Sequence, residues 1–124
     1  MENKELEQYI IDLMHAQCQL KVYHWQTKLY SKHKALDELV GTISEFMDEF
    51  AEVAMGKYGR VDYSGVSYTF ENMTDAGVNT YIDGCIESSN KVQSAFEKTD
   101  TDLMNLRDEI LAALNKTKYL LTLK

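Results

Sequence analysis

The sequence predicts an all-α protein, folded as a single four-helix bundle domain over residues 1–124. Three observations support this fold class. Apolar residues recur at alternating steps of four and three along most of the chain, which is the spacing of one face of an α-helix. The chain contains no proline, which suits long helices better than turn-rich β folds. With 124 residues, 44% of them hydrophobic, the chain has the size of one domain with a substantial core.

The first predicted helix covers residues 3–28. Asn3 suits the N-cap position, because its side-chain oxygen can accept a hydrogen bond from the first turn. The stripe that faces the core consists of Leu6, Ile10, Leu13, Gln17, Leu20 and His24. A second apolar strip surrounds His15, about 180° from His24, and contains Ile11, Cys18 and Val22. We therefore expect this helix to be covered on both sides, and interpret His15 as a packing or subunit-interface residue.

The second predicted helix begins at Ser31, a suitable N-cap, and ends at Gly56 or Gly59. Its apolar stripe consists of Leu36, Val40, Ile43, Met47, Phe50 and Ala54. Residues 59–73 then lose the helical period, which indicates a connection. Fully extended, a connection of this length covers roughly 50 Å. It permits the ferritin-like arrangement with a long crossover between helices two and three, with a plain up-down bundle as the alternative.

Two more helices follow the connection. Thr74 is a suitable N-cap for the third, whose stripe consists of Val78, Ile82, Cys85, Ser89, Val92 and Phe96. The segment KTDTD then breaks the pattern, and Thr99 with Asp102 resembles a capping box for the fourth helix. Its apolar residues are Leu103, Leu106, Ile110, Ala113 or Leu114, and Leu121. Helices of about 22–27 residues form rods of about 33–40 Å that can lie side by side.

The composition argues against several classes of protein. A net charge of −7 repels nucleic-acid phosphates and argues against direct DNA binding. No apolar run of about 18 residues predicts a membrane span, and the first residues, MENKELEQ, do not resemble a secretory signal. Cys18 and Cys85 lie far apart in helical patterns, so we interpret both as reduced, buried side chains. Together these features predict a cytoplasmic protein.

A polar sector lies beside the apolar stripe of the second helix. It spans about 100° of the helical wheel and contains His33, Asp37, Gly41, Ser44, Asp48 and Glu52. A solvated flank is the simpler interpretation, but Glu38, Glu45 and Glu49 already occupy a different side. Gly41 is also unusual on a free surface, because glycine inside a helix costs about 1 kcal/mol relative to alanine. Small residues at Gly41 and Ser44 favour the close approach of another backbone.

This sector cannot bind one metal ion within one chain. Asp37 and Asp48 are about 16 Å apart along the helix axis, whereas metal ligands lie about 2 Å from the ion. Two copies of the helix remove the difficulty if they pack antiparallel about a twofold axis near residues 42 and 43. The pair His33 and Asp37 of one copy then lies against the far end of the other helix, where it meets Asp48 and Glu52. The spacing therefore predicts two identical metal sites for each pair of copies.

His24 is a further candidate ligand. It lies on the core stripe of the first helix, near the start of the second helix if the loop is short. A buried imidazole needs hydrogen-bond partners, and a backbone carbonyl is the structural alternative. With His33 and Asp37 close by, we favour the interpretation of His24 as a ligand.

Together these residues resemble the Dps family of miniferritins. The sequence YHW ends the first helix, and His33, Asp37, Asp48 and Glu52 follow at spacings of four, eleven and four. The family pattern is a His-Trp pair, then His-x3-Asp and Asp-x3-Glu on the second helix. The resemblance covers roughly residues 13–58, and it extends to short ferritin-like proteins of bacteriophages and other large DNA viruses. The chain departs from the family in its short spacing from His24 to His33 and in lacking a lysine-rich tail.

The resemblance implies a function. A site of His24, His33 and Asp37 from one subunit, with Asp48 and Glu52 from its partner, would bind and oxidise Fe(II) and feed an iron store. Trp25 would intercept oxidising radicals, although simple packing is an equal alternative for this residue. Zinc or manganese can substitute for iron on such ligands. The resemblance also implies a homo-oligomer with a twofold helix-two interface, a dodecameric shell, and a host cytoplasmic location if the chain is viral.

The alternative belongs to another functional class. The same helices and apolar stripes would serve a non-enzymatic helical assembly protein, such as a viral structural or accessory module. In that protein the polar sector would only fix the subunit interface, and no ferroxidase activity would remain.

Overall fold

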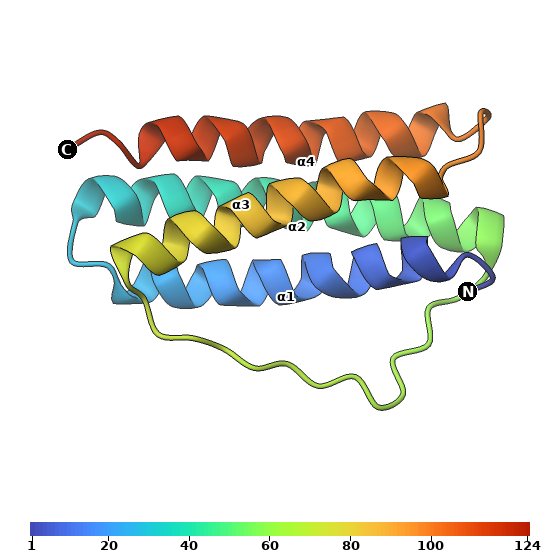
Figure 1. The fold of residues 1–124 in the computed structure, drawn as a ribbon, viewed down its shortest axis with the longest axis horizontal. Helices are drawn as coiled ribbons and strands as arrows, with labels where there is room; N and C mark the ends of the chain where they lie inside the picture. The colour runs from blue at the N-terminus through green and yellow to red at the C-terminus, as the bar shows by residue number, and fades with distance from the viewer.

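The computed structural model describes residues 1–124 and confirms the all-α four-helix bundle (Figure 1). The four helices, with the 3-10 turn η1 directly after the third, are α1 (Lys4–Gln26), α2 (Tyr30–Tyr58), α3 (Asp75–Lys91), η1 (Val92–Ala95) and α4 (Thr101–Leu120). None of these helices combines the length with the apolar composition that a membrane span requires.

The long crossover between α2 and α3 is confirmed. In Figure 1, α2 ends at one end of the bundle and α3 begins at the other, and the connection runs along the bundle between them. Helices α2 and α3 therefore run parallel, while α1 and α4 run in the opposite direction. This connectivity excludes the plain up-down bundle, in which every helix is antiparallel to the next.

Two of the predicted helix caps are confirmed. The Asn3 side chain accepts a hydrogen bond from the backbone N–H of Leu6 at 3.2 Å, and Thr74 Oγ1 accepts one from that of Gly77 at 3.0 Å. Gly59 ends α2 with a φ of 91°, a conformation that glycine adopts without strain. Each of these residues lies directly beside the periodic segment that it bounds.

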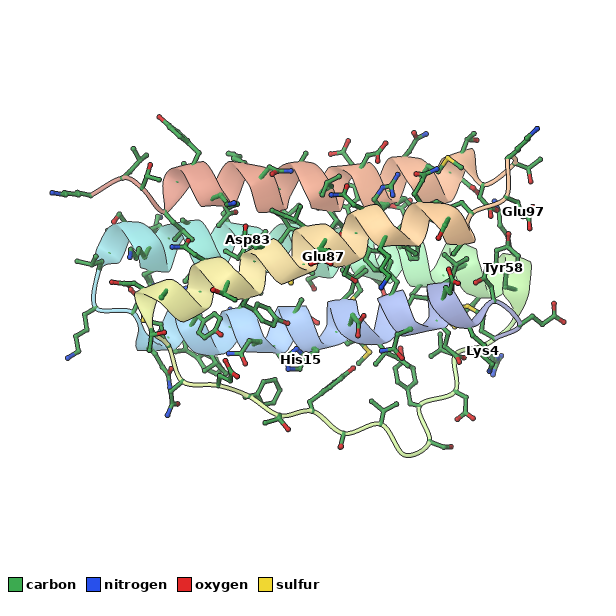
Figure 2. All side chains as sticks on the ribbon, viewed as in Figure 1. Lys4, His15, Tyr58, Asp83, Glu87 and Glu97 are labelled. Carbon is green, nitrogen blue, oxygen red and sulfur yellow. The ribbon has the colours of Figure 1, made fainter.

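The other two predicted starts are wrong. Helix α2 begins before Ser31, with Leu29 at the N-cap position and no side-chain cap. Helix α4 is preceded by Asp100, so Thr99 and Asp102 form no capping box. The reason at α4 is tertiary, because Asp100 is 2% exposed and accepts hydrogen bonds from Lys57 Nζ, Tyr58 OH and the backbone N–H of Glu97. Tyr58 and Glu97 lie at the same end of the bundle in Figure 2.

Helix α3 is shorter than its stripe predicts, because it tightens into η1 before reaching Phe96. Arg107 of α4 lies across this junction. Its guanidinium donates to the Ser89 carbonyl and to the Gln93 side chain, and stands 5.4 Å from the centre of the Phe96 ring. These contacts satisfy a buried cation and hold the tightened turn against α4.

The core follows the predicted stripes, and nineteen buried residues form one cluster that all four helices contribute to. Tyr9 and Phe50 meet edge to face at its centre, with ring centroids 5.3 Å apart. The two cysteines are both free, as predicted, but Cys18 is exposed and Cys85 only half-buried. Cys18 is exposed because it lines a surface hollow, which Val40 of α2 and Phe70 of the crossover also line. Burial raises the pKa of the Cys85 thiol to about 11, so this thiol is neutral at physiological pH.

The outer strip of α1, here the line of Glu7, Ile11, His15 and Gln19, is covered by the crossover. One α1 side chain or carbonyl after another bonds the extended chain. The bonded pairs are Glu7 with Asp62, Ile11 with Tyr68, His15 with Thr69, Gln19 with Glu71, and Gln26 with Asn72 and Met73. Because an isolated extended chain has no partners for its own backbone groups, α1 supplies both acceptors for its N–H groups and donors for its carbonyl oxygens, as a neighbouring strand would in a sheet.

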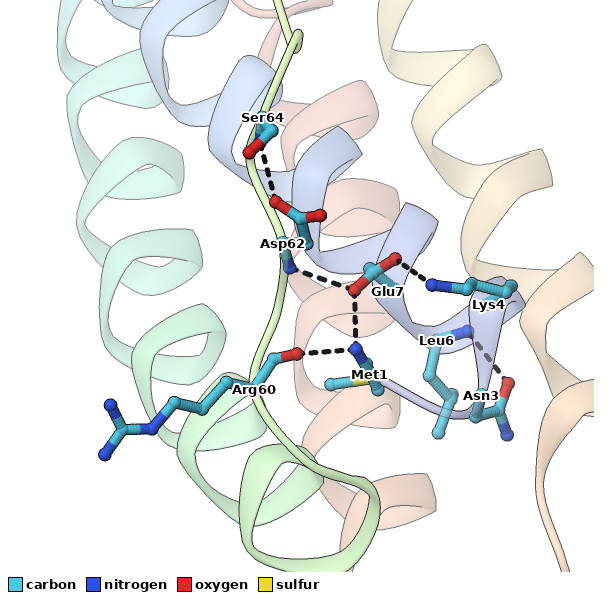
Figure 3. A network of polar contacts seen from close by, with 8 residues as sticks. All are labelled: Met1, Asn3, Lys4, Leu6, Glu7, Arg60, Asp62 and Ser64. Atoms are coloured by element: carbon cyan, nitrogen blue, oxygen red, sulfur yellow. Dashed lines mark hydrogen bonds and ion pairs between the residues drawn. The ribbon is translucent and has the colours of Figure 1, made fainter.

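Glu7 is the first of these contacts (Figure 3). Its carboxylate accepts the backbone N–H of Asp62 at 3.0 Å and the ammonium group of Met1 at 3.0 Å. Lys4 adds an ion pair at 3.3 Å. The hydrogen bond from Asp62, followed by that from the ammonium group, lowers the pKa of the Glu7 carboxyl to about 2.

Candidate metal centre

The two histidines of the predicted site are brought together by the tight turn between α1 and α2. His24 Nδ1 lies 2.7 Å from the carbonyl oxygen of His33, and His33 Nδ1 lies 2.9 Å from the carbonyl oxygen of His24. The rings stack with centroids 3.9 Å apart and 18° between their planes. The short spacing between the two residues in the sequence is thus accommodated by a reciprocal pair of side chain to backbone bonds.

These bonds fix the tautomer of both rings. A carbonyl oxygen can only accept, so each Nδ1 carries the proton and donates it. In the neutral ring, Nε2 then holds a lone pair. No hydrogen bond in the chain uses either Nε2 atom. Donation of one ring nitrogen to a carbonyl while the other stays free is how proteins orient metal-binding histidines, so the donors fit a transition-metal ion.

Asp37 approaches the pair from the next turn of α2. Its Oδ1 lies 3.7 Å from His24 Nε2 and 3.6 Å from Lys21 Nζ. His24 is 7% exposed, whereas the Asp37 side chain is 59% exposed. A deeply placed imidazole nitrogen and a solvated carboxylate therefore converge at the surface, where both can reach an ion arriving from solvent.

Asp48 and Glu52 are not brought to this position within the chain. Both side chains are exposed on α2 and take part in no ion pair or hydrogen bond of the structure. No group of three or more histidine, cysteine, aspartate or glutamate side chains in the chain is arranged to hold a metal ion. Of the predicted ligands, His24, His33 and Asp37 thus lie together within one chain, whereas Asp48 and Glu52 lie apart from them on α2.

The two small residues between the halves differ from each other. A Cβ atom added at Gly41 would meet no atom within 4 Å, so nothing in the chain requires glycine there. Ser44 is half-buried and accepts a hydrogen bond from Gln17 Nε2 at 2.9 Å, which ties it to α1. Gly41 is open in the same way as Gly56 and Gly84, while the small size of Ser44 has an explanation inside the bundle.

Trp25 is 70% exposed, so it is not packed in the bundle. It borders a surface hollow of about 450 Å³ between α1, α2 and the crossover. The hollow is lined by Gln17, Cys18, Lys21, Val22, Trp25, Val40 and Phe70. Two of these residues bond the polar sector of α2, since Gln17 donates to Ser44 and Lys21 pairs with Asp37. The apolar hollow is thus continuous with the polar sector.

His15 is a packing residue, with both ring nitrogens in use. Nε2 lies 2.8 Å from the carbonyl oxygen of Thr69, and Nδ1 lies 2.7 Å from Tyr81 OH. The ring stacks on Phe70 with 5° between the planes. His15 lies on the side of α1 that faces the crossover in Figure 2. Because neither nitrogen is free, this histidine is no candidate ligand.

Sequence reasoning placed Ile11 and His15 on a covered strip of α1, but it missed Glu7 and Gln19, which also hold the crossover. Glu7, Ile11, His15 and Gln19 follow one another at intervals of four, which places them on one line along the helix. Three of the four are polar and one is apolar, and their common line beside the second apolar strip is the signal that this face has a partner. The buried Asp100 was missed as well, and for it the sequence offers no local signal.

Comparisons with known proteins add a family but no function. A family model described as "Family of unknown function (DUF5856)" matches residues 24–121. The chain is similar to the "Uncharacterized 14.6 kDa protein in mobD-ri intergenic region" of Enterobacteria phage T4. The two are 28% identical over 123 residues, which cover 95% of this chain and 88% of the phage protein. No solved structure matches the chain.

Proposed function

We propose that this chain, which belongs to the DUF5856 family, binds Fe(II) at sites shared between two copies and oxidises it, as a Dps-like iron-storage or iron-detoxification protein. The observation that carries the proposal is the locked pair of His24 and His33 beside Asp37. A packing histidine such as His15 uses both ring nitrogens inside the chain. His24 and His33 each use only Nδ1, and His24 Nε2 points toward a carboxylate.

The ligand chemistry suits iron as the substrate. Imidazole nitrogen with carboxylate oxygen binds Fe(II), and the same donors accept Mn(II) or Zn(II) as substitutes. Carboxylates also stabilise the Fe(III) product, because they carry the compensating negative charge. With peroxide as the oxidant, two Fe(II) ions each give up one electron, and the peroxide takes up two protons and leaves as two water molecules. Trp25 directly follows His24 in the sequence and is exposed, so in this proposal it would be oxidised in place of other side chains.

The second half of the site comes from a second copy in this proposal. Asp48 and Glu52 would join His24, His33 and Asp37 when two α2 helices pack antiparallel near Gly41. The open position at Gly41 supports such an approach. The resemblance to the Dps family adds a dodecameric shell and iron storage inside it. The similarity to a phage T4 protein supports a host cytoplasmic location, and the net charge of −7 argues against direct DNA binding.

A second candidate is a non-enzymatic helical assembly protein, and one observation favours it. The hollow beside Trp25 is almost wholly apolar at its surface, and it lies next to the polar sector of α2. An apolar hollow with an exposed tryptophan is suited to protein contact whether or not a metal binds. In this candidate the polar sector would fix the subunit interface only.

The decisive experiment measures Fe(II) oxidation as absorbance growth near 300 nm, with and without peroxide. The variant His33→Ala/Asp37→Ala should reduce the rate at least a hundredfold, because it removes ligands that the substrate needs. Glu87→Ala is the matched control, since Glu87 is an exposed carboxylate on α3 with no partner (Figure 2). Wild-type protein that oxidises no faster than buffer, at its native assembly state, would contradict the proposed function and leave the assembly candidate.

A further inference from the structure

Cationic side chains gather at one end of the bundle, although the chain as a whole is acidic. Residues 21–36 and 110–124 contain seven of the thirteen lysine and arginine residues and none of the twenty aspartate and glutamate residues. The first segment contains the turn between α1 and α2, and the second contains the end of α4. Figure 1 places both at the end of the bundle where α3 begins. We call residues 25–34 and 119–124 the basic end.

The two segments of the basic end touch, and their positive charge is only partly neutralised. Ser31 Oγ donates a hydrogen bond to the carbonyl oxygen of Leu123 at 3.4 Å, which joins the α1–α2 turn to the end of α4. Two neighbouring carboxylates are neutralised in the pairs Lys32 with Asp75 and Lys21 with Asp37. Lys28, Lys34 and Lys124 are exposed and form no ion pair in the chain.

One unpaired carboxylate, that of Glu71, lies on the neighbouring part of the crossover. The backbone of Glu71 is bonded to Gln19, about 9 Å along α1 from Trp25. This carboxylate is therefore set back from the basic end, whose unpaired side chains are all cationic.

The basic end also carries most of the exposed apolar surface of the protein. Five of the eight large hydrophobic side chains that are exposed belong to it, namely Trp25, Leu29, Tyr30, Tyr119 and Leu123. The other three lie on the crossover. Lys34 Nζ stands 5.8 Å from the centre of the Tyr30 ring, so cation and aromatic surface are in direct contact. Lysine, aromatic ring and leucine thus share one surface that the chain leaves uncovered.

This mixture of side chains suits the surface of an anionic membrane. Tryptophan and tyrosine favour the boundary between lipid headgroups and acyl chains. Lysine can lay its apolar stem along that boundary while its ammonium group meets lipid phosphates. Leu29 and Leu123 are apolar throughout, so they gain by leaving water for the acyl region. Single-stranded nucleic acid also binds aromatic and basic surfaces, but leucine offers no aromatic face on which a base can stack.

We propose that the basic end binds the surface of a membrane that contains anionic lipid. None of the helices is long and apolar enough to cross the membrane, so the contact is peripheral. It does not use the iron chemistry of the proposed function.

The distribution of charge sets the orientation of the bound protein. Helix α2 has 29 residues and rises about 43 Å, whereas electrostatic interactions are screened over about 8 Å at physiological ionic strength. With the basic end against the membrane, acidic residues of the opposite end such as Glu2 and Glu97 stand beyond the range of repulsion. A bundle lying on its side would bring carboxylates along its whole length against the lipid phosphates. The protein therefore binds end-on.

Trp25 reports on this contact directly, because it is the chain's single tryptophan and is exposed at the basic end. The full chain is titrated in EDTA with vesicles of phosphatidylcholine alone, and with vesicles of equal parts phosphatidylcholine and phosphatidylglycerol. We expect Trp25 emission to move to shorter wavelength with the mixed vesicles, and partition into them to be at least tenfold stronger. Unchanged emission would overturn the proposal, even if the protein floats with the vesicles, because another surface would then bind.

Reversal of two charges tests the electrostatic part. Each lysine near an anionic surface changes partition by about fivefold, so Lys28→Glu/Lys34→Glu should reduce partition into the mixed vesicles at least tenfold. Lys91→Glu/Lys98→Glu is the matched control, since both lysines are exposed and unpaired outside the basic end. Equal partition by the two variants would overturn the proposal, because net charge rather than this surface would then govern binding.

Replacement of the two leucines tests the apolar part. Leu29→Ser/Leu123→Ser should reduce partition at least tenfold, while Val66→Ser, at an exposed position on the crossover, should partition as wild type does. Circular dichroism confirms that each variant is folded. A leucine variant that partitions as well as wild type would overturn the assignment to lipid.

A final arm separates the membrane from nucleic acid. Fluorescence anisotropy measures binding of the same protein to a labelled single-stranded oligothymidine. We expect binding to the vesicles and none to the oligonucleotide at the same salt concentration. Binding to the oligonucleotide without partition into vesicles would overturn the proposal and assign the basic end to nucleic acid. Failure of Fe(II) oxidation contradicts only the proposed function, since neither EDTA nor the absence of iron should affect partition into vesicles.

Discussion

Two faces of the bundle, the outer strip of α1 and the polar sector of α2, carry sequence patterns that predict a partner. On α1 the partner is the chain's own crossover, which occupies His15 at both ring nitrogens. On α2 the chain supplies no partner for Asp48 or Glu52, and it leaves the Nε2 atoms of His24 and His33 free. The two faces thus differ in how many ring nitrogens the chain itself satisfies, and this difference is what the proposed ligand role of His24 and His33 depends on.

Complementation between two variants is the test with the largest expected effect, and it asks whether two copies share the proposed site on α2. His33→Ala/Asp37→Ala and Asp48→Ala/Glu52→Ala should each be inactive in Fe(II) oxidation. When equal amounts are unfolded and refolded together, half of the random pairs are mixed, and each mixed pair contains one intact site of its two. We expect recovery of about a quarter of the wild-type rate. Activity that fails to reappear in mixed pairs of confirmed mass would mean that the two halves do not share a site.

Removal of His15 tests the other face. His15→Ala deletes both hydrogen bonds and the stack on Phe70, and leaves the carbonyl of Thr69 and the hydroxyl of Tyr81 without that partner. We expect a loss of about 2–4 kcal/mol in the free energy of unfolding. Urea denaturation followed by circular dichroism measures it. The rate of Fe(II) oxidation per folded chain should stay unchanged, and a specific loss of that rate would place His15 in the site.

Gly41→Ala should affect folding and assembly in opposite directions. Nothing in the chain lies within 4 Å of the added Cβ, so the helix should gain about 1 kcal/mol from the better helix former. The midpoint of thermal unfolding at low protein concentration should rise. Self-association in the presence of Mn(II), measured by sedimentation, should weaken because the added methyl group separates the two backbones. Gly84→Ala, at an equally open position on α3, should show only the first effect.

Acid should weaken the contact between Glu7 and Asp62, the first contact of the crossover. This is the smallest effect among the four predictions. The pKa of Glu7 is lowered to about 2 from an ordinary value of 4.5. A carboxyl with a lowered pKa stabilises the fold above its unfolded value, and this contribution is lost as the pH falls from 4.5 toward 2. Glu7→Gln should therefore have a flatter dependence of unfolding free energy on pH in that window. A profile that matches wild type would show that Glu7 is not titrating there.

The periodic parts of the fold could be predicted, and the parts held by irregular contacts could not. The stripes around Leu36 and Ile82 identified the buried faces, because burial follows the helical period. A cover on the outer side of α1 was predicted, but the crossover as that cover was not, since it depends on backbone amides such as that of Glu71, whose path has no period. Helix α4 begins after Asp100 for a similar reason. The Asp100 side chain accepts hydrogen bonds from Lys57 and Tyr58, which lie on α2, far away in the sequence.

The candidate site also combines a part that helix spacing predicted with a part that it could not predict. Spacing along α2 was enough to place His33 and Asp37 one turn apart, because both lie on one helix. The reciprocal bonds of His24 and His33 could not be predicted, since they depend on the path of the loop between α1 and α2. Those bonds fix which nitrogen is free, and so the strongest reason to regard the pair as ligands came from the structure.

The way the crossover is fastened sets which changes of chain length the protein can accept. From Glu7 to Gln26, α1 rises about 28 Å, whereas the chain from Asp62 to Met73 can extend to about 36 Å. The spare length lies in the turn at Tyr63 to Val66, where Gly65 has a φ of 76°, and where the crossover bends away from the bundle in Figure 1. Insertions at Gly65 would only enlarge that bend. A single deletion between residues 68 and 73 would shift every later contact along α1 and pull on the start of α3.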